Sequence, residues 1–242
     1  GYFQISLDEE SKPKTAFSAG AHNYQYVRMA QGLCNSGHTF QALMTKVLGN
    51  MLFESALSYC DDILLMSKTV PLHCEHLNQV FDKFRRANLR LHPGKCVFAV
   101  PQIKYLGHIL SKEGLSVDPA KTEVIRTYPR PLSQKQVRSF LGVVGYYRRF
   151  VENFSIKTSP LRELLKADCK FVWEDRHERS FNEMRQALVT PPVLIYPNLN
   201  KMFILTTDAS AQGIAYILSQ KDEGNREHAV AYGCRGLRGA EA

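Results

Sequence analysis

The sequence predicts an α+β fold, in which strands and helices occupy separate stretches of the chain. Residues 1–115 mix short alternating apolar and polar stretches with two longer stretches of helical periodicity. Residues 116–190 are mostly helical in pattern, and strand patterns return after Pro197. With 242 residues, the chain is long enough for one or two domains with cores of their own.

Hydrophobic periodicity and turn residues define the elements of the first 115 residues. Phe40, Met44 and Leu48 follow helical spacing, whereas two apolar arms flank Cys60-Asp61-Asp62 as in a β-hairpin with acids at its tip. The predicted elements are two or three short strands within 1–30 (with Gly1–Ile5 in mid-strand), a helix over 38–54, a hairpin over 55–68, a helix over 71–87, and short strands near Arg90, Val97 and Lys104.

Capping residues and prolines predict where helices begin and end in the second half of the chain. Asp118 followed by Pro119 is typical of a helix start, and Ser133 with Gln136 predicts a capping box. The predicted elements are a helix from Asp118 that Pro129 ends, a helix with Val137, Phe140, Leu141 and Val144 inward, helices over 157–167 and 175–190, and strands at 203–206, 214–218 and 229–232.

Composition excludes several classes of protein. Hydrophobic residues make up 44% and charged residues 22%, which rules out disordered and collagen-like chains. No apolar stretch approaches the ~20 residues of a membrane helix, so no membrane partner is expected. The six cysteines show no metal-binding spacing and are expected to be reduced intracellular thiols. The N-terminus lacks a signal-peptide pattern, and both ends suggest a fragment of a longer protein.

Asp61 and Asp62 are the first candidate for chemistry. Two adjacent carboxylates repel each other, and a divalent cation relieves this repulsion. The alternative is a solvated turn, because Asp is a common turn residue. Gln31-Gly32 ahead of a helix is suited to a phosphate or a base, or is a plain helix-entry turn. Lys95 is either a phosphate ligand or a surface lysine.

A second candidate is a basic stretch between Glu123 and Glu152. It holds six basic residues and no acid, with Tyr146 and Tyr147 among them, and the net charge of the chain is +8. This pattern favours binding to a nucleic-acid backbone, with a solvated basic face as the alternative. The six residues are Arg126, Arg130, Lys135, Arg138, Arg148 and Arg149.

Seven segments in chain order resemble the reverse transcriptases of gypsy-class long-terminal-repeat retrotransposons. They are Gly1–Ile5 (the end of polymerase motif A), Met29–Asn35 (motif B), Tyr59-Cys60-Asp61-Asp62 (the Y-x-D-D box), Leu91–Cys96 (motif D), Lys104–His108 (the primer grip), Arg138–Phe150 (the thumb) and Leu205–Ser210 (the first ribonuclease H strand). Two positions depart from the family: Ala30 and Gly37 stand where it usually has Pro. The first motif A Asp is expected before Gly1, and the later ribonuclease H carboxylates beyond Ala242.

The resemblance implies a right-hand polymerase fold: palm with partial fingers over 1–115, helical thumb over 116–155, connection over 156–200, and the start of a ribonuclease H-like α/β domain over 201–242. It implies RNA-directed DNA polymerisation with attached ribonuclease H, using Mg²⁺ with Mn²⁺ as a substitute. The partners would be an RNA template, a DNA primer, an RNA/DNA hybrid and deoxynucleoside triphosphates. The location would be a cytoplasmic virus-like particle or the nucleus.

The resemblance also assigns roles to individual residues. Asp61 and Asp62 would bind metal in the polymerase site, and Asp208 in the ribonuclease H site. Lys95 would protonate pyrophosphate, and Tyr2, Gln31 and Gly32 would bind the nucleotide. Primer and template contacts would come from Tyr105, Leu106, Gly107, Arg138, Arg148 and Arg149. Two alternatives stay open: a catalytically dead nucleic-acid-binding remnant, and a structural partner subunit.

Overall fold

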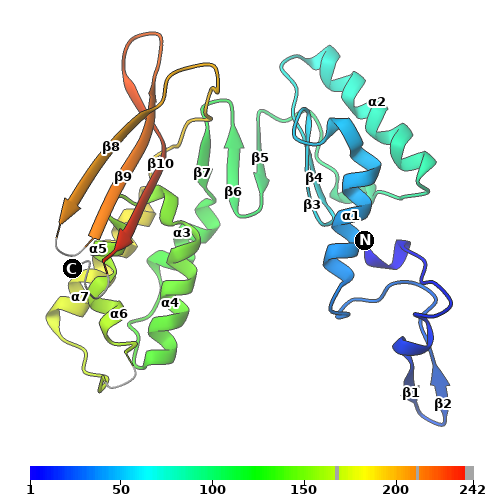
Figure 1. The fold of residues 1–242 in the computed structure, drawn as a ribbon, viewed down its shortest axis with the longest axis horizontal. Helices are drawn as coiled ribbons and strands as arrows, with labels where there is room; N and C mark the ends of the chain where they lie inside the picture. Colours follow the sequence, from blue (N-terminus) through cyan, green and yellow to red (C-terminus); the bar gives the residue numbers. More distant parts are fainter. Residues whose placement is uncertain (167–168, 211–212, 238–242) are drawn as a thin grey trace. The chain divides into compact units, whose positions relative to one another are not determined.

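A computed structural model describes residues 1–166, 169–210 and 213–237 (Figure 1). Contacts divide the chain into two compact units, Gly1–Val100 and Pro101–Ala242, and each is described by itself. Both contain helices and antiparallel strands, which confirms the predicted α+β class. In the part of the chain that the structure describes, no helix has the length and apolar character required to cross a bilayer.

The first unit contains two β-hairpins and two long helices. Its elements are the 3₁₀ helices η1 (Tyr2–Gln4) and η2 (Pro13–Thr15), strands β1 (Phe17–Ala19) and β2 (His22–Tyr24), helix α1 (Ser36–Leu48), η3 (Gly49–Met51), strands β3 (Ala56–Tyr59) and β4 (Asp62–Leu65), helix α2 (Val70–Arg86) and η4 (Pro93–Lys95).

The core of the first unit lies between α1, α2 and the β3–β4 hairpin. Phe40, Met44 and Leu48 recur every four residues along α1 and are fully buried. They pack with Val80 and Phe84 of α2 in one apolar cluster. This core holds the hairpin that carries the paired acids.

The second unit joins a three-stranded sheet, a helical layer and a second three-stranded sheet. Its elements are β5 (Gln102–Tyr105), β6 (His108–Ser111), β7 (Leu115–Val117), α3 (Pro119–Arg126), α4 (Gln134–Tyr146), η5 (Arg148–Phe150), α5 (Phe154–Lys157), α6 (Ser159–Glu163), α7 (Asp175–Val189), β8 (Ile204–Ser210), β9 (Gly213–Lys221) and β10 (Glu227–Gly236).

The helices of the second unit begin where the sequence predicts caps. Asp118 accepts a hydrogen bond from the Ala120 N–H, and Ser133 accepts one from the Gln136 N–H. Only half of the predicted capping box forms, because Gln136 Oε1 accepts from the Leu132 N–H instead. Phe140 of α4 packs against Phe181 of α7 at the centre of the core, with ring centroids 4.7 Å apart.

Five predicted elements were wrong in extent or type. Gly1–Ile5 is a 3₁₀ turn closed by local hydrogen bonds, and not a strand. The helix expected over 38–54 ends at Leu48, because Gly49 takes a φ of 56°. Strands near Arg90 and Val97 do not form in the described chain. The helix expected over 157–167 is split into α5 and α6, with a proline in the first turn of α6.

Candidate active site and nucleic-acid interface

The β3–β4 hairpin carries Asp61 and Asp62 on a tight turn, as the sequence predicts. Tyr59 pairs with Asp62 across the strands, so Cys60 and Asp61 alone form the connection. Cys60 has a φ of 50°, in the left-handed region. Both carboxylates face solvent, and the Asp61 side chain is 65% exposed. Their exposure leaves both carboxylates accessible to a ligand.

Gln41 of α1 fixes the backbone of this turn, and sequence reasoning missed it. Its side-chain oxygen accepts the Cys60 N–H at 2.8 Å, and its side-chain nitrogen donates to the Ser58 carbonyl at 3.3 Å. The Cys60 N–H is therefore satisfied within the protein. The two carboxylates of the turn are left as acceptors for a ligand.

Tyr2 and Gly1 lie beside the acidic turn. The Tyr2 ring meets Phe40 edge-on, with centroids 5.5 Å apart. Burial raises the pKa of the Tyr2 hydroxyl, and the neighbouring Cys60 and Asp61 raise it further. The Gly1 nitrogen is 3.8 Å from Asp61 Oδ2. A residue joined to Gly1 in a longer chain would thus be close to this carboxylate.

Gln31 and Gly32, predicted to bind the nucleotide, and Lys95, predicted to protonate pyrophosphate, belong to the same unit as the acids. Gln31 and Gly32 are exposed in the turn before α1, where Gly32 takes a φ of 88°. Lys95 is exposed in η4, and its segment is anchored where Gln4 hydrogen-bonds the backbone of Arg90. Within the fully described first unit, no hydrogen bond or ion pair joins Lys95 to Asp61 or Asp62.

A second tight turn, in the other unit, carries Leu106 and Gly107 between β5 and β6. Their φ angles are 48° and 76°. Tyr146 Oη donates to the Leu106 carbonyl at 2.7 Å, and Tyr147 Oη donates to the Gly107 carbonyl at 3.2 Å. The structure therefore brings Leu106 and Gly107 of the predicted primer grip against the C-terminal end of α4, which Arg148 and Arg149 follow in the chain.

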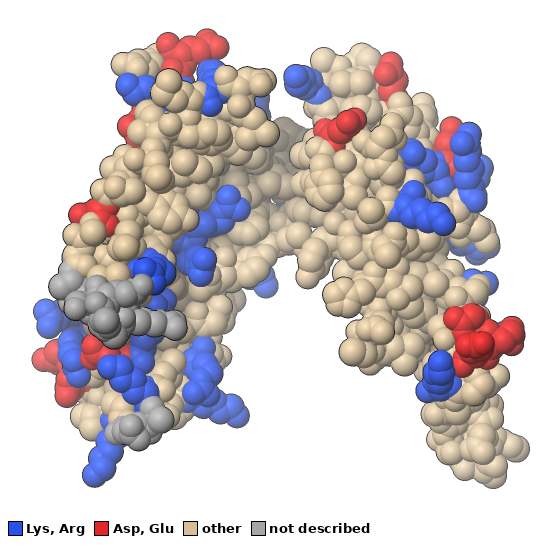
Figure 2. Space-filling model, in the orientation of Figure 1, with Lys and Arg blue, Asp and Glu red and all other residues tan. Residues whose placement is uncertain are grey.

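The structure separates the six basic residues of the predicted stretch into two groups. Arg126 pairs with Glu123 at 2.6 Å, and Arg130 pairs with Glu178 at 3.6 Å. The other four are exposed, and none of them forms an ion pair with a described residue. These four, named here the free basic group, are Lys135, Arg138, Arg148 and Arg149. Figure 2 shows basic side chains gathered over the region of α3 and α4.

α4 also contains Gly142, which is exposed, and Gly145, which is half-buried. A Cβ atom added at either position would meet nothing within 4 Å. Glycine inside a helix costs roughly 1 kcal/mol relative to alanine. Packing within the described chain therefore does not explain why glycine and not alanine occupies these two positions. A helix surface without side chains at these two positions, beside basic residues, would let a nucleic-acid backbone approach closely.

Asp208 lies on β8 at the edge of the second sheet and is exposed. It pairs in register with Ala215 of β9. No group of three or more metal-ligating side chains forms among the residues the structure describes. In the described chain Asp208 is therefore not part of a cluster of three metal-ligating side chains, and Asp61 and Asp62 are two carboxylates adjacent in sequence.

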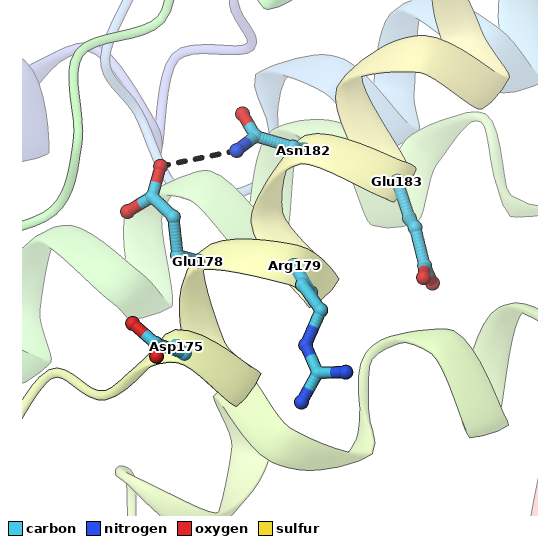
Figure 3. Close-up of a pocket in the computed structure, with 5 residues that line it drawn as sticks. All are labelled: Asp175, Glu178, Arg179, Asn182 and Glu183. Atoms are coloured by element: carbon cyan, nitrogen blue, oxygen red, sulfur yellow. Dashed lines mark hydrogen bonds between the residues drawn. The ribbon is translucent and has the colours of Figure 1, made fainter.

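A hollow of about 570 Å³ lies elsewhere, along one face of α7 (Figure 3). Figure 3 shows that every residue lining it comes from this one helix. Its lining carries three carboxylates and one arginine, and none of the predicted site residues. The lining residues are Asp175, Glu178, Arg179, Asn182 and Glu183. An acidic surface of this kind is unsuited to a polyanion.

Two family models match the chain. Residues 1–110 match the family described as reverse transcriptase (RNA-dependent DNA polymerase). Residues 173–242 match the RNase H-like domain found in reverse transcriptase. The acidic turn lies within the first match, and Asp208 lies within the second.

Relatives and solved structures agree with these matches. The Pol polyprotein of transposon 297 of Drosophila melanogaster is 38% identical over 91% of this chain, and that of transposon gypsy is 34% identical over 91%. The Tf2-3 polyprotein of Schizosaccharomyces pombe is 31% identical over 96% of the chain. The chain spans about a fifth of the length of these curated relatives.

The fold resembles that of a foamy viral protease-reverse transcriptase. One structure, in complex with double-stranded DNA, aligns over 96% of this chain and 41% of its own, with a TM-score of 0.86 and 23% identity. Another, in complex with an RNA/DNA hybrid, aligns over 99% and 32%, with a TM-score of 0.84. The chain belongs to the reverse transcriptase and RNase H region of gypsy-type retrotransposon Pol polyproteins.

Proposed function

We propose that this chain is part of an RNA-directed DNA polymerase with attached RNase H, and that its polymerase chemistry takes place at the acidic turn. The observation that carries the proposal is the pair of exposed carboxylates at a hairpin turn that Gln41 fixes by accepting the Cys60 N–H. The substrates would be deoxynucleoside triphosphates, a DNA primer and an RNA template. We keep 1–115, 116–155, 156–200 and 201–242 as proposed limits of palm, thumb, connection and RNase H start.

The donor set of the acidic turn fits Mg²⁺. This ion is usually held by one or two carboxylates together with waters and substrate phosphates, and Asp61 and Asp62 provide such a pair. A divalent ion bound there would lower the pKa of the primer 3′-hydroxyl and offset charge on the triphosphate. Mn²⁺ would substitute for it. In this proposal Asp208 is the first metal-binding carboxylate of the RNase H site.

The remaining residues of the first unit would bind and orient the nucleotide. Tyr2, held by Phe40 beside the turn, would lie under the sugar and exclude a ribose 2′-hydroxyl. Gln31 and Gly32 would contact the nucleotide or the template from the exposed turn before α1. Lys95 would donate a proton to the leaving pyrophosphate, which requires substrate to bridge it to the acids.

The second unit would bind the template–primer duplex. The free basic group supplies four charges for phosphates, and the glycines of α4 leave room for a close backbone. Similar folds are known in complex with double-stranded DNA and with an RNA/DNA hybrid, which supports a duplex as the ligand. Tyr105, Leu106 and Gly107 would contact the primer. The proposed location of the reaction is inside the cell, in a cytoplasmic virus-like particle or in the nucleus.

The test is primer extension on an RNA template by the longer parent protein with Mg²⁺. Asp61→Asn removes one ligand charge and is expected to lower the rate by roughly 10²-fold or more, with a smaller loss for Asp62→Asn. The matched control is Asp82→Asn, an exposed carboxylate of α2 that pairs with Arg85. If the parent protein shows no extension but binds the duplex, the proposal fails in favour of a nucleic-acid-binding remnant.

A further inference from the structure

The Leu106–Gly107 turn has a backbone that its own sequence does not favour. Tyr105 pairs with His108, so the connection between β5 and β6 consists of Leu106 and Gly107 alone, both with positive φ. Glycine adopts such angles freely, whereas a bulky residue such as leucine rarely does. A conformation of this kind persists only where surrounding groups hold it.

Three donors from the following segment hold the two carbonyls of this turn. The Tyr146 and Tyr147 hydroxyls donate to the Leu106 and Gly107 carbonyls, and the Asp118 N–H also donates to Gly107 O at 3.3 Å. A Cβ added at Gly107 would lie 3.1 Å from Tyr147 Oη, so the turn and the tyrosine are in close contact. Burial raises the pKa of Tyr147, which therefore stays a donor at neutral pH.

The two tyrosines also enclose the residue that follows the turn. The His108 ring stacks on Tyr146 at 5.5 Å and 15°, and meets Tyr147 edge-on at 5.6 Å. Burial lowers the pKa of His108, and the nearby Arg149 lowers it further, so a neutral ring is favoured. The two tyrosine hydroxyls hold the carbonyls of the turn, and the two tyrosine rings pack against His108 at its end. Both sets of contacts stabilise the conformation of the turn.

The N–H groups of the turn remain available. Neither the Leu106 nor the Gly107 N–H donates to a backbone or side-chain acceptor among the described residues. Successive free N–H groups in a turn form an anion-binding concavity. Arg148 and Arg149 follow directly after the two tyrosines and add positive charge.

We propose that Tyr146 and Tyr147 are positioning residues that keep the Leu106–Gly107 turn in the conformation that offers its N–H groups to a nucleic-acid phosphate. The inference rests on the proposed function, because it assumes that a duplex binds this unit. It assigns to the two tyrosines a role other than stacking on bases. The ligand chemistry is a phosphodiester of a duplex backbone.

The test uses Tyr146→Phe and Tyr147→Phe, singly and together, in the 242-residue chain. Both substitutions keep the rings and remove only the hydroxyls. We expect the double variant to bind a labelled RNA/DNA hybrid about tenfold more weakly with an unchanged salt dependence, because no charge is lost. Hydrogen exchange of the Asp118 amide, which donates to the same turn, is expected to accelerate at least tenfold.

A second substitution makes the test specific to the turn. Leu106→Gly removes the cost of the positive φ and is expected to restore most of the lost affinity in the double variant. The matched control is Tyr128→Phe, which removes a hydroxyl bonded to Ser139 in the same unit. This control is expected to change neither affinity nor Asp118 exchange.

The outcomes separate this inference from the proposed function. If the unmodified chain shows no salt-dependent binding to the hybrid, the proposed function fails and the phosphate role fails with it. If the unmodified chain binds but the double variant keeps its affinity and its Asp118 exchange rate, only the positioning role is overturned. Failure of Leu106→Gly to restore binding also overturns it, because the hydroxyls would then act elsewhere.

Discussion

The acidic turn at Cys60-Asp61 and the turn at Leu106-Gly107 are built alike but expose opposite chemistry. Each joins two antiparallel strands through two residues, and each contains a residue other than glycine with positive φ. In the first turn Gln41 accepts the Cys60 N–H, and the exposed carboxylate oxygens of Asp61 and Asp62 remain for a ligand. In the second turn two tyrosines bind the carbonyls, so that N–H donors remain.

The difference shows how side chains of a neighbouring helix determine which groups of a hairpin turn, acceptors or donors, remain free for a ligand. A side-chain acceptor from α1 leaves the first turn with oxygens suited to a divalent cation. Two side-chain donors from α4 leave the second turn with N–H groups suited to a phosphate. Metal and phosphate are the two ligands that the proposed nucleotidyl transfer requires. The helix side chains behind each turn are therefore as informative as the turn residues.

The largest expected effect concerns the charge beside the second turn. Arg148→Ala combined with Arg149→Ala is expected to weaken binding of an RNA/DNA hybrid and to reduce its salt dependence. With four phosphate contacts from the free basic group, log K should fall with log salt at a slope of about −3 to −4. The double variant should flatten this slope by up to about two. Fluorescence anisotropy across a salt titration measures both quantities.

A control variant can remove the same number of positive charges at another place in the same unit. Arg126→Ala combined with Arg130→Ala removes two charges that already pair with Glu123 and Glu178. This variant is expected to leave the slope nearly unchanged. Equal flattening by both double variants would mean that overall charge, and not the neighbourhood of the second turn, determines binding.

A smaller effect is expected at the first turn. Gln41→Ala removes the acceptor of the Cys60 N–H and should lower the free energy of unfolding of the first unit by about 1–3 kcal/mol. Gln41→Glu keeps the acceptor and is expected to lose less. Hydrogen exchange of the Cys60 amide measures the local effect. An unchanged Cys60 exchange rate in Gln41→Ala would show that the side chain does not hold this turn.

The smallest expected effect has opposite signs in two measurements. Gly142→Ala and Gly145→Ala replace glycines whose added Cβ atoms meet nothing in the described chain. Each should stabilise the second unit by about 0.5–1 kcal/mol, because alanine favours helix. Each should also weaken duplex binding, if a nucleic-acid backbone approaches this surface. Trp173 is the only tryptophan of the sequence and lies in this unit, so its fluorescence reports the unfolding.

Local patterns predicted much of the fold. The acidic hairpin, α2 and the caps at Asp118 and Ser133 depend on residues within a few positions of one another, and the structure confirms them. Gly1–Ile5 alternates like a strand but is closed by its own turn hydrogen bonds. Alternation alone cannot reveal this, because a strand also needs a partner along its length.

The arrangement around the two turns depends on contacts between distant residues. Gln41 lies 19 positions before the Cys60 amide that it binds, and no local pattern connects the two. The sequence places six basic residues in one stretch without acids, but Arg130 pairs with Glu178 from a later helix. Tyr146 and Tyr147 were interpreted as aromatics for nucleic acid, whereas their hydroxyls bind a turn 40 positions earlier. The roles of the individual site residues stay predictions.

The most direct test of the two-turn account is one NMR sample of the 242-residue chain titrated first with Mn²⁺ and then with a short RNA/DNA hybrid. The account predicts that Mn²⁺ broadens the amide signals of Cys60, Asp61 and Asp62 and leaves Leu106 and Gly107 sharp. The hybrid is predicted to shift the Leu106 and Gly107 amides. Broadening spread over surface acids such as those of α7, together with unshifted Leu106 and Gly107 amides, would contradict the account.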